Sequence, residues 1–323
     1  MSPEPALLAT AWRGDVPEAE YRGHVAVVDA TGRVVDALGD PDAITTLRSC
    51  VKPLQALPFI RLAVDRLGAP EDEVAIACSS HSGEPEHVAV VQRLLSRAGL
   101  DEASLACGPQ LPFDEHAAAA RIRAGTGLQR IDNNCSGKHA AMLATCVAAG
   151  WPVLGYERRD HPMQRAVAEA MGELLGSDLS EAPYGIDGCG LPTYGLPLQT
   201  VARAFAAGQA DHAFRRGLDA MAAHPHLVAG TGRFDTALLA AVGDRVASKI
   251  GGAAIWAGAL RPDGPGIAVK LEAGADPAIP AVALAVLRRL GVQPDGLETM
   301  QRPVLRNWSG DEVGEIRIAT ILV

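Results

Sequence analysis

The sequence is poor in aromatic side chains and in basic charge, and it has no long apolar run. Aromatic residues make up 4% of the 323 residues, and 29 Lys and Arg stand against 38 Asp and Glu, giving a formal net charge of −9. A nucleic-acid surface needs clustered Lys and Arg, so this balance argues against a nucleic-acid partner. The apolar stretch Ala278–Leu287 contains Pro280 and is ten residues long. Because a bilayer span needs ~20 apolar residues, no membrane partner is expected.

Cysteine is also sparse, and an export signal is not evident. The six cysteines show no spacing typical of small secreted domains. Met1–Pro5 has no basic segment followed by an apolar core, so we expect a cytoplasmic protein. Apolar residues nevertheless make up 48% of the chain, which excludes disorder as its main state. The length allows one large domain or two closely packed ones.

The hydrophobic pattern changes twice along the chain. Strands are expected at 6–12, 24–29 and 33–38, and again at 245–260, 266–271 and 315–322. Helices are expected at 53–67, 88–99, 138–149, 162–175, 198–207 and 281–290. This order predicts one sheet built from about 1–45 and 230–323, with a mainly helical region of about 46–229 packed on it or beside it. We interpret 1–323 as a single domain, without the alternating pattern of a doubly wound fold.

The segment with the sharpest chemistry is Ser49-Cys50-Val51-Lys52-Pro53, between the first strands and the first helix. A serine three residues before a lysine on a helix places both side chains on one face. A neutral lysine can take the proton of a serine hydroxyl, and burial or a nearby cation lowers its pKa enough to make it neutral. A helix start also favours an oxyanion. The alternative is that Ser49 caps the helix and Lys52 is solvated.

A second candidate segment, Cys78–Glu84, contains Ser80 and His81. It follows the apolar run Val74–Ala77, which we interpret as a strand, and it precedes a helix. A strand that ends in a hydroxyl-rich loop with glycine is a typical location for a site. The alternative is ordinary helix capping by Ser82, with Glu84 in the first turn.

The third segment, Asn133–His139, gathers a thiol, a lysine, an imidazole and two amides at a helix start. It fits a cysteine nucleophile with His139, a soft-metal site or a substrate cradle. Cys189, in Asp187-Gly188-Cys189-Gly190, is the distant partner for a two-thiolate zinc site. Neither cysteine has the Cys-x-x-Cys spacing, and lysine is an unusual zinc ligand because it must lose its proton. Spacing alone therefore leaves these alternatives open.

Two segments in the C-terminal half complete the set. In Ser248-Lys249-Ile250-Gly251-Gly252 a strand lysine could point into a cleft while glycine leaves room for a ligand; otherwise Lys249 is a surface lysine. The Gly-rich segment His226–Thr236 could be structural, with Arg233 and Asp235 paired.

Taken together, these segments resemble the rhizobial-type L-asparaginases, the group called asparaginase II. The motifs that carry the resemblance run in order along nearly the whole chain: Arg48–Pro53, Ser80-His81, Asn133–His139, Asp187-Gly188-Cys189, Val228–Thr236 and Val313–Arg317. Several long motifs in the right order are more specific than any one of them.

The resemblance implies a fold and a set of roles. The fold would be an α/β (α+β) sandwich like that of the serine β-lactamases and glutaminases. Ser49 with Lys52, and Ser80 with Lys249, would form two Ser–Lys pairs facing one cleft. Cys135, Lys138 and Cys189 would hold a zinc ion. The substrate-binding residues would be Arg48, His81, Asn134, His139 and Asp187. A homodimer is also expected.

The implied reaction is hydrolysis of the side-chain amide of L-asparagine to L-aspartate and ammonia. Ser49 would attack the amide carbon, Lys52 would take its proton, and the Ser80–Lys249 pair would relay a proton to the leaving ammonia. Zinc would hold the charged end of the substrate or polarise groups nearby. One departure stands out: relatives usually show Lys-x-Gly-Ala-Glu-Gly, but Lys249-Ile250-Gly251-Gly252-Ala253-Ala254 lacks the carboxylate. Lys270 is therefore a competing second lysine.

Other functions remain as alternatives. A glutaminase or another amidase on the same fold would differ in the substrate length accepted. A β-lactamase or penicillin-recognising acyltransferase would be exported, and no export signal is evident. A non-catalytic zinc or ligand-binding relative would not need the Ser49–Lys52 pair. The threonine-based asparaginases carry a Thr-Gly-Gly-Thr stretch near the N-terminus, which is absent here. The autoprocessing type needs a Gly–Thr cleavage site, and Gly230-Thr231 lies in a motif that the resemblance explains better.

Overall fold

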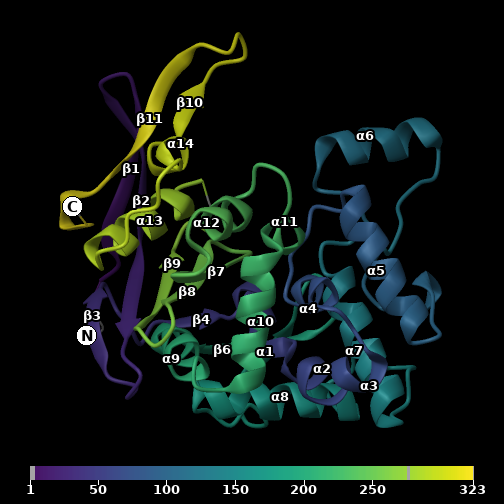
Figure 1. Cartoon of the computed structure of the whole chain (residues 1–323). Helices are drawn as coiled ribbons and strands as arrows, with labels where there is room; N and C mark the ends of the chain where they lie inside the picture. The colour runs from purple at the N-terminus through teal and green to yellow at the C-terminus, as the bar shows by residue number, and fades with distance from the viewer. Residues whose placement is uncertain (1–3, 275–276, 323) are drawn as a thin grey trace.

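The computed structural model describes residues 4–274 and 277–322 and has a large antiparallel sheet with helices on both faces (Figure 1). The strands are β1 (Ala6–Arg13), β2 (Val16–Val28), β3 (Val34–Leu38), β4 (Ile44–Thr46), β5 (Tyr184–Ile186), β6 (Pro192–Pro197), β7 (Val246–Gly251), β8 (Ile255–Leu260), β9 (Gly266–Leu271), β10 (Val304–Arg306) and β11 (Glu312–Ile318). The large sheet has the order β10-β11-β1-β2-β9-β8-β7, and β3 pairs with β2. Both ends of the chain therefore build one sheet, as the sequence predicts.

The middle of the chain is mainly helical, as predicted. The α-helices are α1 (Lys52–Gln55), α2 (Leu57–Leu62), α3 (Val64–Leu67), α4 (Glu71–Ala77), α5 (Pro85–Arg97), α6 (Glu115–Ala124), α7 (Ser136–Ala149), α8 (Pro162–Leu175), α9 (Leu198–Gly208), α10 (His212–Ala223), α11 (Pro225–Val228), α12 (Phe234–Val242), α13 (Ile279–Arg289) and α14 (Glu298–Gln301). The described residues also include the 3-10 turns η1 (Arg48–Val51), η2 (Glu102–Ser104) and η3 (Thr320–Leu322).

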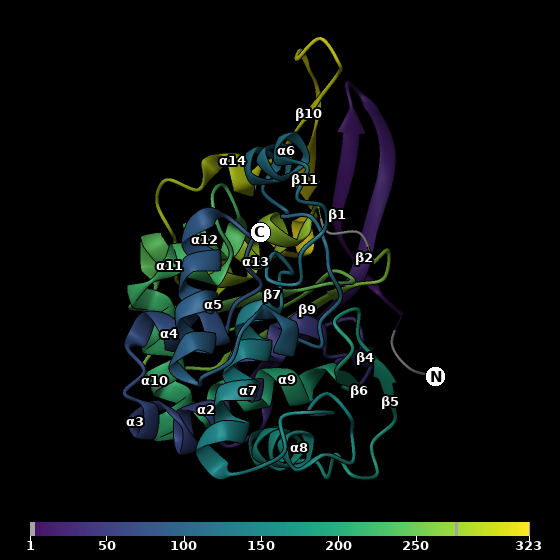
Figure 2. The ribbon, with the colours of Figure 1, turned by 90° about the vertical axis from the view of Figure 1, so that its right-hand side faces the viewer.

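Side chains that alternate in direction along the strands divide the apolar core between the two faces of the sheet. Val25 and Val27 of β2 pack with α12 and α13 in one apolar cluster, whereas Ala26 and Val28 pack with the helical region in the other. Side chains of a strand point alternately to opposite faces, so a buried strand feeds both clusters. Figure 2, turned from Figure 1, shows helices α2, α7, α8, α9 and α10 below the strands β7 and β9. The described architecture is a mixed α/β protein.

Several predicted elements differ from the structure. The strand expected at 315–322 ends at Ile318 and is followed by the 3-10 turn η3. The helix expected at 53–67 is three short helices, and Pro58, which has no N–H to donate, accounts for the break between the first two. The strand expected at Val74–Ala77 is the end of α4, whose first turn carries Glu71, Asp72 and Glu73 and so favours a helix start. The strand expected at 245–260 is two strands, with β7 and β8 antiparallel around a turn at 252–254.

A small second sheet of order β4-β6-β5 has no counterpart in the prediction. Its strand β4 leads directly into η1, and β5 leads into the segment Asp187–Cys189. The small sheet thus brings two of the predicted motifs next to each other, although they lie far apart in the sequence.

Candidate active site

A cleft of about 330 Å³ lies where these segments meet the end of β7. It is lined by Arg48, Ser49, Ser80, Gln110, Phe113, Asn133, Asn134, Cys135, Asp187, Gly188, Cys189, Arg233, Ile250, Gly251 and Gly252. The volume is at the small end of the range for ligand sites. A larger groove of about 880 Å³ contains arginines and tyrosines of the 158–194 region, but none of the predicted site residues lines it. The chemistry therefore points to the smaller cleft.

Ser49 and Lys52 occupy one turn between β4 and α1. Ser49 lies in the 3-10 turn η1, where side chains three residues apart eclipse each other. Lys52 is fully buried, and its Nζ donates to the carbonyl oxygens of Ser79 at 2.6 Å and Asn134 at 3.2 Å. Burial lowers the pKa of Lys52 to about 8. The reading of Lys52 as a solvated lysine behind a capping Ser49 is therefore wrong, and no side-chain cap is formed at η1.

Ser80 follows α4 and lines the cleft from the opposite segment. Its backbone N–H donates to the carbonyl oxygen of Val228 at 2.9 Å, which fixes the loop. Its Oγ is buried and has no hydrogen-bond partner among the described residues. A buried hydroxyl without a partner is costly in an ordinary loop, so its position on a cleft fits a reactive or ligand-binding group.

Lys249 lies behind the cleft on β7, and its ammonium group forms an ion pair with a carboxylate. Its Nζ is 3.3 Å from Oδ2 of Asp235 and donates to the carbonyl oxygen of Ile250 at 2.8 Å. Burial lowers the pKa of Lys249, while Asp235 opposes the shift. The expected Arg233–Asp235 pair is thus wrong, and Asp235 pairs with Lys249 instead. Lys270 lies on β9, two strands away, and does not line the cleft.

Arg48 and Asp187 form an ion pair on the rim, with Nε 2.9 Å from Oδ1. Arg48 has a φ of 48°, an uncommon value for a residue with a side chain. Strain of this kind persists where the surroundings hold the residue in place, and such residues cluster at functional sites. Asn134 lies beside them on the cleft, and its carbonyl oxygen accepts from Lys52.

The two predicted histidines lie behind the cleft rather than on it. His81 is fully buried, with Nε2 2.9 Å from Oγ of Ser136 and Nδ1 accepting from the N–H of Gly83. Nδ1 of His139 is 2.6 Å from the hydroxyl of Tyr156. Burial lowers the pKa of His81 well below its usual value and that of His139 to about 3, so both are neutral. The hydrogen bonds of these two neutral histidines hold the segments that form the wall of the cleft.

Cys135, Lys138 and Cys189 converge on the floor of the cleft. All three are nearly fully buried, and Nζ of Lys138 donates to Sγ of Cys189 at 3.4 Å. A hydrogen bond from the Cys135 thiol and the charge of Lys138 lower the pKa of Cys189, which favours its thiolate form. Burial tends to lower the pKa of Lys138, but the two sulfur atoms and Asp187 outweigh it and raise the pKa. Two sulfurs and an amine in contact form a donor set that fits zinc once the amine and the second thiol lose their protons.

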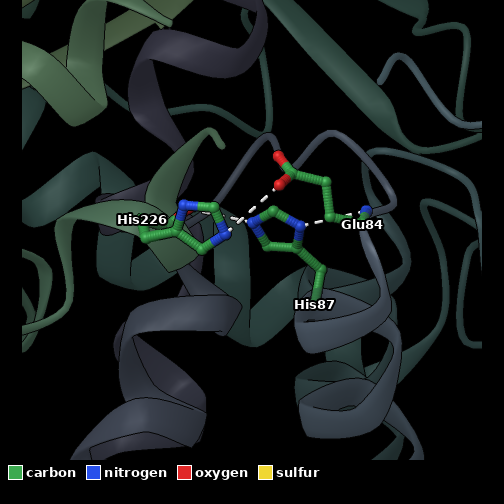
Figure 3. Close-up of side chains that lie close together, drawn as sticks. All are labelled: Glu84, His87 and His226. Carbon is green, nitrogen blue, oxygen red and sulfur yellow. Dashed lines mark hydrogen bonds and ion pairs between the residues drawn. The ribbon is translucent and has the colours of Figure 1, made fainter. Parts of the chain in front are cut away.

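Glu84, His87 and His226 form a second cluster of metal-binding side chains outside the cleft (Figure 3). Nδ1 of His87 accepts from the N–H of Glu84 at 3.1 Å, so Nε2 carries the proton that the carbonyl oxygen of His226 accepts at 2.9 Å. Both nitrogens of His87 are engaged, and neither is free for a metal. The His87 and His226 rings also stack, with centroids 4.9 Å apart. The cluster, called the brace below, holds the neighbouring loop in place, because Glu84 accepts hydrogen bonds from Thr231.

Among the cleft residues that were not predicted as site residues, three carry side chains from outside the motifs assigned to the site: Gln110, Phe113 and Arg233. Arg233 stands in a segment that the sequence analysis singled out, but it was assigned to the wrong partner. Gln110 and Phe113 come from a loop with no motif, and only the fold brings them to the cleft. No signal in the sequence could have found these two.

The geometry defines a class of protein: a mixed α/β chain with two serines on one small cleft and two fully buried lysines directly behind it. The sequence model of the family described as L-asparaginase II matches residues 9–318. The chain belongs to the L-asparaginase II family and is an asparaginase-type amidohydrolase acting on a small molecule. None of the helices in the described part of the chain is long and apolar enough to cross a membrane.

Other comparisons add little. No curated protein matches the chain. Among solved structures, the native form of Mglu is 17% identical, with a TM-score of 0.46 over 88% of this chain and 69% of the other. A putative beta-lactamase from Bacteroides dorei is 14% identical, with a TM-score of 0.40 over 82% of this chain and 93% of the other. Both likenesses are too distant to carry an argument, so the family model alone identifies the chain.

Proposed function

We propose that this protein is an L-asparaginase in which Ser49 is the nucleophile and Lys52 is its base. The observation that carries the proposal is the state of Lys52. It lies one 3-10 turn after the cleft-lining Ser49, is fully buried, and has a pKa near 8. A lysine with this pKa is partly neutral at physiological pH and can accept a hydroxyl proton. Few structural roles require a lysine to be buried without a carboxylate partner.

The proposed reaction has two halves. In the first, Oγ of Ser49 attacks the side-chain amide carbon and Lys52 takes its proton. The tetrahedral intermediate then breaks its C–N bond, the nitrogen gains a proton, and ammonia leaves an ester on Ser49. In the second half, water attacks the ester, and cleavage of the C–O bond restores Ser49 and releases aspartate. One amide and one water are consumed, and one acid and one ammonia are formed.

Ser80 and Lys249 form the second pair of the proposal, relaying the proton to the leaving nitrogen. The unpartnered hydroxyl of Ser80 on the cleft supports this role. So does the lowered pKa of Lys249, which stems from burial and makes proton exchange accessible. Asp235 stands on the inner side of Lys249 and would stabilise its protonated form.

Zinc is the proposed cofactor, with Cys135, Lys138 and Cys189 as its ligands. When bound, the ion would act as a Lewis acid or a fixed positive charge at the cleft floor. The serine β-lactamase and glutaminase type of fold is proposed as well, supported by an antiparallel sheet with helices on both faces and Ser-x-x-Lys at the start of the helical region.

A paired assay of ammonia release from L-asparagine and L-glutamine tests the proposal. We expect turnover of asparagine with little turnover of glutamine, because the cleft is small and one methylene is worth ~10–200-fold in discrimination. Equal turnover of both amides would indicate a general amidase. No turnover of either would favour a binding protein.

A further inference from the structure

Apart from Lys52, whose Nζ donates to two backbone carbonyl oxygens, the charged groups around the cleft have charged or sulfur partners, with one exception. Arg48 pairs with Asp187 at 2.9 Å, and Lys249 pairs with Asp235 at 3.3 Å. Lys138 contacts the Cys189 thiolate at 3.4 Å. Arg233 lines the same cleft and has no acidic partner within residues 4–274 and 277–322.

The guanidinium of Arg233 is held on one side only. Its Nη1 donates to the carbonyl oxygen of Ser80 at 3.1 Å and lies 3.4 Å from Oγ of Ser82. Its central carbon is 5.8 Å from the ring centroid of Phe113, which also lines the cleft. Arginine has five N–H donors in a rigid fork, and the described contacts use Nη1. The edge formed by Nε and Nη2 is therefore available to a carboxylate, which it fits in bidentate geometry.

The loop that carries Arg233 is fixed before any ligand binds. The carboxylate of Glu84 accepts from the backbone N–H and from the hydroxyl of Thr231, both at 2.8 Å. Gly230 has a φ of 125° and packs so closely that a Cβ there would lie 2.4 Å from Oε1 of Glu84. Glu84 belongs to the brace seen in Figure 3. A cation on a preformed loop binds an anion without a further ordering cost.

We propose that Arg233 binds the α-carboxylate of the amino-acid substrate, through its Nε and Nη2 edge. The identity of the substrate rests on the function proposed above, whereas the chemistry of the site, a carboxylate beside Ser80, rests on the charges and contacts alone. An arginine without an acidic partner beside the two cleft serines favours an anionic group on the ligand. The cleft then selects amides that carry a free carboxylate and rejects asparagine whose carboxylate is blocked, as in the interior of a peptide.

The test compares Arg233→Gln with the wild type on two amides. One is L-asparagine, and the other is 3-aminopropanamide, which lacks only the α-carboxylate. We expect Arg233→Gln to raise KM for asparagine about 30- to 100-fold, as for loss of a charged hydrogen-bonded pair, and to change kcat/KM for 3-aminopropanamide less than threefold. Arg233→Lys, which keeps the charge without the fork, should recover part of the loss. Equal losses on both amides, or no loss on asparagine, would overturn the proposal.

A binding measurement separates this proposal from the proposed function. Calorimetric titration with L-aspartate should show binding to the wild type and at least ~30-fold weaker binding to Arg233→Gln. If asparagine is not hydrolysed but aspartate binds in this Arg233-dependent way, the carboxylate site stands and the proposed reaction fails. If asparagine is hydrolysed but aspartate binds both proteins equally, the proposed reaction stands and the carboxylate site at Arg233 fails. Arg245→Gln is the matched control, because Arg245 is exposed and does not line the cleft.

Discussion

The ammonium group of Lys249 lies 3.3 Å from a carboxylate oxygen of Asp235, and both side chains are fully buried. Asp235 also accepts from the hydroxyl of Ser248 at 2.8 Å and from the backbone N–H of Ile250. One carboxylate therefore fixes three consecutive residues of β7. The partner of Lys249 comes from the start of α12, and not from the residues that follow Lys249 on β7.

Asp235→Asn should destabilise the protein in a pH-dependent way. Loss of the carboxylate leaves a buried ammonium uncompensated, which costs about 3 kcal/mol. It also lowers the pKa of Lys249 further, so the penalty applies where Lys249 is protonated and shrinks as the pH rises. Urea unfolding at pH 6 and pH 9 measures the difference from the wild type at each pH. Asp36→Asn, which breaks a half-exposed pair with Arg289, should cost less than about 1 kcal/mol. An equal loss for Asp235→Asn at both pH values would contradict the account.

The activity should rise with pH through the ionisation of Lys52. Only the neutral amine accepts the Ser49 proton, and burial lowers the pKa of Lys52 to about 8. Below that value the neutral fraction grows about tenfold per pH unit, so kcat/KM should climb from pH 6 and level off above pH 9. Lys52→Arg should remove activity at every pH, because arginine keeps its proton. A flat wild-type profile from pH 6 to 10 would exclude Lys52 as the base.

Much of the fold was predictable because local signals agreed with the final packing. Helix α8 has the predicted bounds, with Pro162 at its first position and Gly176 in the left-handed conformation just past its end. The run Val74–Ala77 was misread because four apolar residues fit a strand or a buried helix equally well. Strands β4 and β5 have three residues each, and both pair with β6, so their pairing depends on the tertiary structure.

The parts of the site that lie within one short sequence motif were predictable. The Ser49–Lys52 turn is set within four residues, and the cleft gathers it with Ser80, Cys135 and Cys189. The partners of charged groups were not predictable, since Asp235 reaches Lys249 through the packing of α12 on β7. Arg233 was misassigned for the same reason: the sequence offers a neighbouring Asp, but the fold turns the two side chains to different partners.

Ser49→Ala should abolish activity without unfolding the protein. The hydroxyl makes no cap at η1, so its removal should change the free energy of unfolding by less than about 0.5 kcal/mol. Ammonia release and thermal unfolding, measured together, check both halves of the expectation. Ser96→Ala, an exposed position on α5, serves as the control with full activity. Near-normal turnover in Ser49→Ala would move the nucleophile to Ser80 or Cys135.

The zinc proposal predicts that two cysteines act together. Protein purified without chelator should contain exchangeable zinc, and Cys135→Ser and Cys189→Ser should each lower its content and raise KM. Cys146→Ala is the matched control, since Cys146 is buried on the same helix as Lys138 but does not line the cleft. Elemental analysis and melting curves with added zinc decide the matter. No zinc, together with no effect of added zinc on affinity or Tm, would leave Cys135 as part of a substrate cradle.

The contact between β7 and η1 predicts that Gly251 cannot carry a side chain. A Cβ at Gly251 would lie 2.7 Å from Cγ2 of Ile255, 2.8 Å from the backbone nitrogen of Cys50 and 3.1 Å from that of Ser49. Two of these atoms are backbone, so Gly251→Ala must push the strand and the turn apart. Overpacking of this kind costs about 1–3 kcal/mol, and a displacement of about 1 Å at a nucleophile costs about 100-fold in rate.

The matched control for Gly251→Ala is Gly185→Ala on the exposed strand β5, where a Cβ meets open space. That variant should stay within about 0.5 kcal/mol of the wild type and keep its kcat. Measuring kcat below the melting temperature of each variant separates the loss of rate from the loss of folded protein. If folded Gly251→Ala turned over asparagine at the wild-type rate, Ser49 would not depend on its contact with β7. The reacting serine would then have to be one that this strand does not position.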